Sequence, residues 1–288
     1  MPVPPGLHVV ATPIGNLGDM TLRAIAVLQK ADVIACEDTR VTAKLRVAFG
    51  IATPMIAYHE HNAARMRPIL IERLKRGETV ALVSDAGTPL ISDPGYRLVQ
   101  EAREAGLPVI AAPGPSAVLA ALAVAGLPTD RFLFVGFLPV RAAARREALA
   151  ELRTIAATLV LFEAPHRLSE SLADMAAVLG ARDAAICREL TKRHEEVRRG
   201  SLPDLAAAYA RDGAPRGEIV VIIGPPAAQA AHEPPDDAAV DAMLREALVR
   251  LGTRDAAAEV AAHTGLKRRV LYARALALSR EIPDGRPG

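Results

Sequence analysis

The chain has 288 residues, of which 51% are hydrophobic and 24% are charged. This balance allows one large or two medium-sized domains with a substantial core, and it excludes a disordered chain, a collagen and a coiled coil. Aromatic residues make up 3% and tryptophan is absent, so the core must be aliphatic and a base-stacking single-strand binder is disfavoured. The formal charge of +2 permits a nucleic-acid partner without requiring one.

The cysteines and the N-terminal residues indicate in which cellular compartment the protein acts. Cys36 and Cys187 lie far apart in sequence, which argues against a disulfide-rich scaffold and a CxxC metal site. The first residues, MPVPPGLHVV, lack the basic region and long apolar core of a signal peptide. The longest apolar stretch, residues 118–127, is too short to cross a bilayer. We therefore expect a cytoplasmic protein with no membrane partner.

Apolar runs alternate with amphipathic stretches in the first part of the chain. Strands are predicted at residues 7–11, 32–37, 54–58, 79–84 and 108–111. Helices are predicted at residues 21–30, 41–49, 62–76, 95–105 and 116–125. This alternation is typical of an α/β fold with a mainly parallel, doubly wound sheet.

The order of elements changes after residues 126–130. Strands are predicted at residues 132–135, 158–162, 184–190, 195–199 and 218–223, and helices at residues 141–153 and 166–179. Because two of these strands follow each other without a predicted helix between them, we expect a mixed α/β second domain.

A Pro- and Ala-rich stretch, residues 224–237, resembles a linker. Three helices are predicted beyond it, at residues 238–251, 254–263 and 267–280, and TGLKRRVLYARAL has helix-turn-helix character. The predicted organisation is an α/β domain at residues 1–126, a second at 127–224, a linker at 225–237 and a small helical domain at 238–288.

Three glycine-containing loops follow predicted strands: TPIGNLGD (residues 12–19), SDAGTP (84–89, continuing to SDPG at 92–95) and APGPS (112–116). Each alone fits an ordinary turn. Ligands bind at the carboxyl ends of strands in open parallel sheets, so loops gathered at one edge indicate a binding site. GxGxxG, GxxxxGK[ST], GxSxG and HExxH are absent, which disfavours a Rossmann dehydrogenase, a P-loop NTPase, an α/β-hydrolase and a zincin.

Charged clusters end several predicted strands: EDTR (37–40), YHEHN (58–62), EAPHR (163–167) and RELTK (188–192). Surfaces are charged in any protein, so such clusters also fit ordinary strand ends. On an extended segment His59 and His61 share a face. Two histidines without further spaced ligands are a weak zinc signal, so we expect hydrogen bonding and no metal.

Eight blocks in order carry a family resemblance: VVATPIGNLGDMTLRAI, ACEDTR, YHEHN, VSDAGTPLISDPG, APGPSA, FVGFLP, FEAPHR and RELTKRHEE. Together they resemble the ribosomal small-subunit methyltransferase I family, of the tetrapyrrole methylase superfamily. The resemblance implies two α/β domains with an S-adenosylmethionine cleft between them and a small C-terminal helical domain. It also implies 2′-O-methylation of a cytidine in the decoding region of 16S rRNA, in the small subunit or its precursor, by a homodimer.

The resemblance implies that the cofactor lies against the glycine loops and second-domain strand ends. The implied positions are Pro13, Asp85, Ala86, Gly87, Thr88, Pro89, Ser116, Ala117, Phe162, Ala164, Leu190 and Ile219. Thr88 stands where the superfamily's Gly-Asp-Pro loop is acidic. Ser116 and Ala117 open a helix whose free backbone N–H groups suit a carboxylate.

Methyl transfer to a ribose hydroxyl needs aligned reacting atoms and a group that accepts a proton or stabilises an anion. The catalytic candidates are Glu37, Asp38, Glu163, His166 and Lys192. The RNA-binding candidates are Arg40, His59, His61, Arg141, Arg145 and Arg167. The helix that carries Arg141 and Arg145 also fits a solvated face, balanced by Glu147 and Glu151.

Two other functions remain open. A methyltransferase of a tetrapyrrole precursor, a polycarboxylate, needs an arginine-lined pocket, and the YHEHN and EAPHR blocks and the helical tail disfavour it. A non-catalytic RNA-binding protein of the same fold is disfavoured by the intact cofactor-type loops. The tail either contacts RNA through Lys267, Arg268 and Arg269 or packs on the rest of the protein.

Overall fold

The computed structural model describes residues 2–92, 95–226, 237–264 and 266–279. Two compact units are present, Met1–Pro226 and Ala227–Gly288. Most of the predicted linker, residues 227–236, lies outside the described residues, as do residues 93–94 of the second glycine loop and residue 280 of the last predicted helix. No helix among the described residues has the length and apolarity needed to span a membrane.

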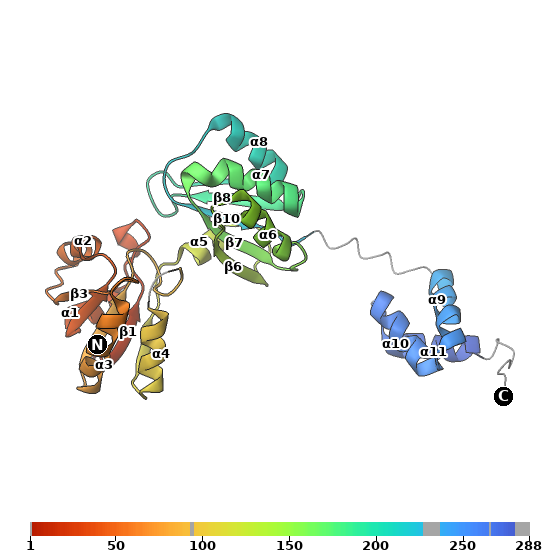
Figure 1. The fold of residues 1–288 in the computed structure, drawn as a ribbon, viewed down its shortest axis with the longest axis horizontal. Helices are drawn as coiled ribbons and strands as arrows, with labels where there is room; N and C mark the ends of the chain where they lie inside the picture. The colour runs from red at the N-terminus through yellow and green to blue at the C-terminus, as the bar shows by residue number, and fades with distance from the viewer. Residues whose placement is uncertain (1, 93–94, 227–236, 265, 280–288) are drawn as a thin grey trace. The chain divides into compact units, whose positions relative to one another are not determined.

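The first sheet of the larger unit, in which Figure 1 labels β1 and β3, is entirely parallel. Its strands are β1 (Gly6–Val10), β2 (Val33–Cys36), β3 (Met55–Ala57), β4 (Thr79–Val83) and β5 (Val109–Ala112). They lie in the order β3-β2-β4-β1-β5. The carboxyl ends of all five strands therefore lie at one edge, which brings together the loops that follow β1, β4 and β5.

Four helices cover the two faces of this sheet: α1 (Leu22–Lys30) and α2 (Thr39–Phe49) on one, α3 (Ala63–Lys75) and α4 (Tyr96–Glu104) on the other. Apolar side chains at helical spacing form both layers, because residues three and four apart share a helix face. Leu28 packs with Val10 on one side, and Leu70 packs with Leu7 on the other. The predicted doubly wound α/β sheet is confirmed.

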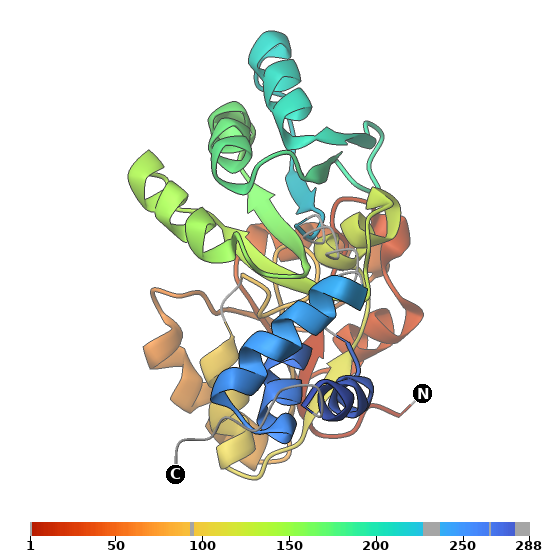
Figure 2. The same cartoon turned by 90° about the vertical axis from the view of Figure 1, so that its right-hand side faces the viewer.

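The second sheet is mixed. Its strands are β6 (Phe132–Phe137), β7 (Thr158–Glu163), β8 (Asp183–Arg188), β9 (Glu196–Ser201) and β10 (Ile219–Ile223). They lie in the order β6-β7-β10-β8-β9; β6 and β7 are parallel and the other neighbours antiparallel. α6 (Ala142–Leu152), α7 (Leu168–Leu179) and α8 (Leu202–Asp212) lie side by side on one face (Figure 2).

The sequence analysis missed α8, although its ends carry recognisable signals. The Ser201 hydroxyl accepts a hydrogen bond from the Asp204 amide, Pro203 stands in the first turn, and Gly213 follows the last residue. Ser at the N-cap, Pro in the first turn and Gly after the end are typical helix boundaries.

α5 (Ala117–Ala125) covers the opposite face of the second sheet. Its side chains Val118 and Leu122 belong to one apolar cluster with Val160 and Val220 of that sheet. In chain order this helix belongs to the first domain, yet it packs against the second sheet. The N-terminus of α5 consequently lies where the two halves of the unit meet.

The smaller unit is a three-helix bundle of α9 (Asp237–Arg250), α10 (Thr253–Thr264) and α11 (Arg268–Ser279). Leu244, Val260 and Leu271 are buried in its core. Arg274 of α11 forms ion pairs with Asp237 and Asp241 of α9, which fixes the first helix against the last.

Candidate functional site

Two adjoining cavities lie at the carboxyl edge of the first sheet. The first has a volume of about 450 Å³ and the second about 370 Å³. Ile14, Ala86 and Glu218 line both. The two cavities are therefore immediate neighbours.

The first cavity lies between the loop after β4, the start of α5, the end of β7 and the start of β10. Its wall consists of Ile14, Ala86, Gly87, Thr88, Ile91, Ser92, Ser116, Ala117, Val118, Phe137, Phe162, Glu163, Ala164, Pro165, Cys187, Leu190, Gly217, Glu218, Ile219 and Val220. Most of these side chains are apolar. Burial raises the pKa of the Cys187 thiol to about 11, so this thiol is neutral.

Local hydrogen bonds fix the loops that form this wall. Gly87 and Thr12 pair through their backbones, and the Thr88 hydroxyl donates to the Pro115 carbonyl over 3.0 Å. Gly87 has a φ of +79°, and a Cβ there would lie 3.2 Å from Cγ2 of Ile14, so only glycine fits without strain. The Ser116 hydroxyl caps α5 by accepting from the Leu119 amide. The free N–H groups of the first turn of α5 therefore lie at the cavity wall.

The aromatic side of the first cavity is built by β6 and β7. The rings of Phe137 and Phe162 meet edge to face with centroids 5.6 Å apart, and Phe134 packs on Phe162 at 5.0 Å. The register of β6 against β7 shifts between Phe134 and Gly136, and Gly136 has a φ of +75°. This bulge places Phe137 over the cavity.

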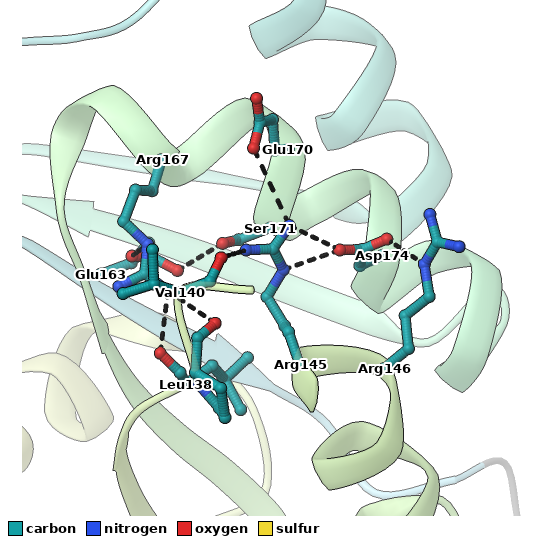
Figure 3. Close-up of polar contacts among 10 residues, drawn as sticks. Leu138, Val140, Arg145, Arg146, Glu163, Arg167, Glu170, Ser171 and Asp174 are labelled. Atoms are coloured by element: carbon teal, nitrogen blue, oxygen red, sulfur yellow. Dashed lines mark hydrogen bonds and ion pairs between the residues drawn. The ribbon is translucent and has the colours of Figure 1, made fainter. Parts of the chain in front are cut away.

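One buried arginine, Arg145, and one partly buried arginine, Arg167, hold the segment that follows Phe137 (Figure 3). Arg167 donates to the carbonyl oxygens of Leu138, at 2.8 Å, and Pro139, at 3.1 Å. Arg145 donates to the Val140 carbonyl at 3.1 Å and forms an ion pair with Asp174. Residues 137–140 therefore have a fixed path beside the cavity.

The second cavity has both apolar and charged walls. It is lined by Thr12, Pro13, Ile14, Gly15, Leu17, Val41, Thr42, Lys44, Leu45, Ser84, Asp85, Ala86, Lys192 and Glu218. Asp85 Oδ1 accepts a hydrogen bond of 3.0 Å from the Asp38 amide, which ties the end of β4 to the start of α2. Within the residues that the structure describes, neither Asp85 nor Lys44 forms an ion pair.

Lys192 stands at the junction of the two halves. Its Nζ lies 2.8 Å from Glu189 Oε1 and 3.0 Å from Glu218 Oε2, and Glu189 Oε1 also accepts from the Glu218 amide at 2.9 Å. Burial alone would lower the pKa of Lys192, but its hydrogen bonds to the two carboxylates raise that pKa above its ordinary value. Lys192 is therefore a cation at neutral pH.

Two glycines leave room for the side chains packed at this junction. Gly15 has a φ of +135°, and a Cβ there would lie 2.2 Å from Cε of Lys192. Gly217 has a φ of +99°, and its Cβ would lie 2.4 Å from Cδ of Glu189. Beside Gly15, the Asn16 side chain donates to the Thr191 carbonyl at 3.1 Å. The loop after β1 is thus fastened to the loop after β8.

The structure places most of the predicted cofactor residues together on the first cavity. These are Ala86, Gly87, Thr88, Ser116, Ala117, Phe162, Ala164, Leu190 and Ile219. Pro13 and Asp85 line the second cavity instead, and Pro89 lines neither.

The catalytic candidates are dispersed. Lys192 lines the second cavity. Glu163 lines the first, but its side chain is 1% exposed, and it accepts from the Ala164 amide and the Ser171 hydroxyl and faces Arg167 (Figure 3). Its oxygens are therefore engaged within the protein. His166, in the short helix η2 (Pro165–Arg167), is exposed and lines neither cavity.

Glu37 and Asp38 follow β2 and also lie off both cavities. Burial and the nearby Asp85 raise the pKa of Glu37. Asp38 is the N-cap of α2, and hydrogen bonds from Arg40 lower its pKa to about 2. The catalytic candidates did not include Glu218, the carboxylate that lines both cavities. Its position after a glycine at the start of β10 was the available signal.

Two of the RNA-binding candidates are in the interior. The side chain of Arg145 is 3% exposed and that of Arg167 is 14% exposed, and both hold residues 137–140 as described above. The expectation that Arg145 faces RNA phosphates needs correction, because its donors are used inside the protein, whereas an RNA contact of the partly exposed Arg167 stays a prediction. Arg141 is exposed, and Arg40 is exposed and paired with Asp38.

His59 and His61 do not lie on an extended segment. Residues 60–62 form a turn, in which the Asn62 side chain accepts from the His59 amide at 3.0 Å. The two rings meet edge to face with centroids 6.0 Å apart. The condition under which they would share the face of a strand is therefore not met, because the side chain of Asn62 stabilises a turn before α3.

Comparison with known proteins connects these cavities to a family. Residues 6–206 match the family model of tetrapyrrole (corrin/porphyrin) methylases, and residues 234–279 match that of the RsmI C-terminal HTH domain. Similar folds include diphthine synthase (TM-score 0.58, 19% identity, covering 76% of this chain and 90% of that one). Uroporphyrin-III-C-methyltransferase from Thermus thermophilus is another (TM-score 0.53, 23% identity, covering 76% and 93%).

Closer relatives share the whole chain. A ribosomal RNA small subunit methyltransferase I from Mesorhizobium japonicum is 51% identical over 288 residues, 100% of this chain and 97% of the relative. One from Xylella fastidiosa is 47% identical over 274 residues, 94% of this chain and 99% of the relative. The resemblance found in the sequence is confirmed. The chain belongs to the ribosomal RNA small subunit methyltransferase I family and has the tetrapyrrole methylase fold.

Proposed function

We propose that this protein transfers the methyl group of S-adenosylmethionine to the ribose 2′-oxygen of a cytidine in the decoding region of 16S rRNA. Family membership supports the reaction and the RNA substrate. The observation that carries the proposal is the pair of cavities with a shared wall. Methyl transfer needs a donor site and an acceptor site next to each other, and two neighbouring cavities provide such a pair.

The first cavity fits the methyl donor. Its volume of about 450 Å³ lies in the ordinary range for ligand pockets, and its wall is mostly apolar with few polar groups. The backbone N–H groups at the start of α5 suit the carboxylate of the methionine moiety. When bound, S-adenosylmethionine supplies a methyl group already activated by its positive sulfur.

We assign the holding of the donor to the loop residues Ala86–Thr88, the start of α5, the end of β7 and the start of β10. The backbone and apolar side chains there orient the ligand and exclude water. Holding the reacting atoms in line at close distance removes a large part of the barrier to such a displacement. No arginine lines either cavity within the described residues, so neither suits a polycarboxylate tetrapyrrole precursor.

We assign the proton transfer to Glu218 and Lys192. Glu218 lines both cavities, and its Oε2 is held by the Lys192 ammonium, so its other oxygen can accept the proton of the 2′-hydroxyl. Lys192 carries a raised pKa and remains protonated, so it donates a hydrogen bond and stabilises the developing negative charge instead of acting as a base. Glu163 and Asp38 are engaged elsewhere.

Basic residues outside the cavities are proposed to bind the RNA. Arg40, Arg141, His59 and His61 are proposed to contact phosphates, which position RNA without reading its sequence. The substrate is the small ribosomal subunit or its precursor. The enzyme acts in the cytoplasm as a homodimer, and the domain boundaries follow the sequence prediction except that α5 packs with the second half.

The test combines purified protein, labelled S-adenosylmethionine and small ribosomal subunits from cells that lack this gene. Mass spectrometry then maps the label. The expected result is one methyl group on the 2′-oxygen of a single decoding-region cytidine. Binding of S-adenosylmethionine without any label on RNA would overturn the rRNA assignment.

A further inference from the structure

We infer that the second cavity receives the target nucleotide, extruded from the RNA, and that Asp85 selects cytosine by accepting a hydrogen bond from its exocyclic amino group. The inference rests on the proposed methylation of RNA. The second cavity thus holds the nucleotide beside the cavity assigned to the methyl donor. Asp85, which the family resemblance places against the donor, selects the base instead.

The walls of the second cavity suit a base. Leu17 of the short helix η1 (Leu17–Asp19) and Val41 and Leu45 of α2 line it, and Leu17 and Val41 are 51% and 37% exposed. Apolar side chains that line a cavity and remain open to solvent give a bound ring a surface to pack on. Enzymes that act on an extruded nucleotide hold its base between apolar side chains and read its edge with a few polar groups.

Asp85 is the reading group that the cavity offers. Its Oδ1 is fixed by the Asp38 amide at 3.0 Å, and no cation pairs with it in the described ranges. The other carboxylate on this wall, Glu218, is bound to Lys192. A carboxylate accepts hydrogen bonds and donates none, so it attracts the amino group of cytosine and repels the O4 carbonyl of uracil.

The remaining charged groups fit the other parts of a nucleotide. Lys44 is exposed on the wall and unpaired among the described residues, which suits a flanking phosphate. Glu218 lies at the wall shared with the first cavity, and Lys192, which lines the second cavity, binds it; this pair suits the ribose. Base, ribose and phosphate thus each meet a group of the matching chemistry, with the 2′-oxygen toward the methyl donor.

The first test replaces Asp85 with asparagine. The amide oxygen of Asp85→Asn still accepts from the Asp38 amide, while its NH₂ group donates to uracil O4. Rates are measured on subunits reconstituted with cytidine or uridine at the target position. We expect the preference for cytidine to fall by about 5- to 150-fold, the range of a base-reading contact. Asp183→Asn, an exposed carboxylate at the start of β8, serves as control and leaves the ratio unchanged.

The second test fills the cavity with Val41→Trp. We expect methylation of RNA to fall more than tenfold while the Kd for S-adenosylmethionine, measured by calorimetry, stays within twofold. An active Val41→Trp protein, or an unchanged cytidine preference in Asp85→Asn, overturns the inference. If Asp85→Asn binds S-adenosylmethionine more weakly and keeps its base preference, Asp85 contacts the methyl donor and not the base. If the unaltered protein fails to methylate rRNA, the proposed function fails instead.

Discussion

Replacing Arg145 with methionine should destabilise the larger unit strongly and leave intrinsic RNA affinity unchanged. The side chains of Arg145 and Asp174 are 3% and 4% exposed, and the two are 2.6 Å apart (Figure 3). Arg145 also satisfies the Val140 carbonyl. A phosphate contact would instead require an exposed guanidinium.

The expected loss in free energy of unfolding depends on the contacts that Asp174 keeps after the substitution. Breaking a buried ion pair costs about 3–5 kcal/mol, because one charge is left without compensation. Arg146 still contacts the other oxygen of Asp174 at 2.6 Å, so the lower end, about 3 kcal/mol, applies. For a unit of this size each kcal/mol lowers Tm by about 2–4 °C, which gives a decrease of about 6–12 °C.

Urea unfolding followed by circular dichroism, at fixed salt and pH, measures this effect. Arg146→Met is the matched control: its side chain is 62% exposed, so its loss should cost about 0–1 kcal/mol. The double variant Arg145→Met/Asp174→Leu removes both buried charges and should recover much of the lost stability. Equal costs for the two arginines, or a loss of RNA affinity in Arg145→Met without any loss of stability, would refute the reasoning.

The remaining predictions concern the junction, acid stability and the helical unit. Glu218→Gln should lower kcat about 100-fold with an unchanged Kd for S-adenosylmethionine, whereas Glu196→Gln on β9 should have no effect. Gly15→Ala should displace Lys192 and reduce kcat, while Gly50→Ala, which meets nothing within 4 Å, should cost only stability. Burial alone would raise the pKa of Asp174, but hydrogen bonds from Arg146 and Arg145 lower it overall. The ionised Asp174 therefore stabilises the fold fully above its unfolded pKa of about 4, and this stabilisation is lost as the pH falls through its lower folded pKa. The free energy of unfolding should consequently fall less steeply with acid in Arg145→Met/Asp174→Leu than in the unaltered protein. Replacing the exposed Lys267, Arg268 and Arg269 with alanine should reduce the salt dependence of RNA binding by about 2 in log–log slope, and Arg250→Ala should not.

Three outcomes would contradict these expectations. An unchanged kcat in Glu218→Gln would move the proton acceptor elsewhere. Full activity of Gly15→Ala would show that Lys192 has no role in the reaction. An unchanged salt slope would leave the smaller unit without a phosphate contact at the start of α11.

Local sequence patterns predicted most helices and strands because their apolar periodicity is strong. Residues 202–212 carry both cap signals and apolar side chains at helical spacing, Leu202, Leu205 and Tyr209, so α8 could have been predicted from the sequence. The turn at His59 depends on one side chain, Asn62, which the alternation of histidines concealed.

The site itself depends on contacts between distant segments. The motifs located the first cavity, because glycine loops after parallel strands have a fixed place in such sheets. Lys192 binds Glu218 because Gly15 and Gly217 leave room for the side chains at this junction. These residues are far apart in the chain, so no spacing rule applied to one sequence predicts the contact. Arg145 was misjudged for the same reason: its partner Asp174 is on another helix.

α5 has a consequence for any attempt to divide or recombine this protein. A cut at residue 126 leaves the apolar side of α5 on a fragment with nothing to cover, and it strips one face from the second sheet. A cut within residues 113–115 keeps α5 with the sheet on which it packs, and of the contacts described above it touches only the Thr88–Pro115 hydrogen bond. Gene fusions, split-protein reporters and the exchange of halves between relatives should therefore join at 113–115, where the cores separate, and not where the sequence composition changes.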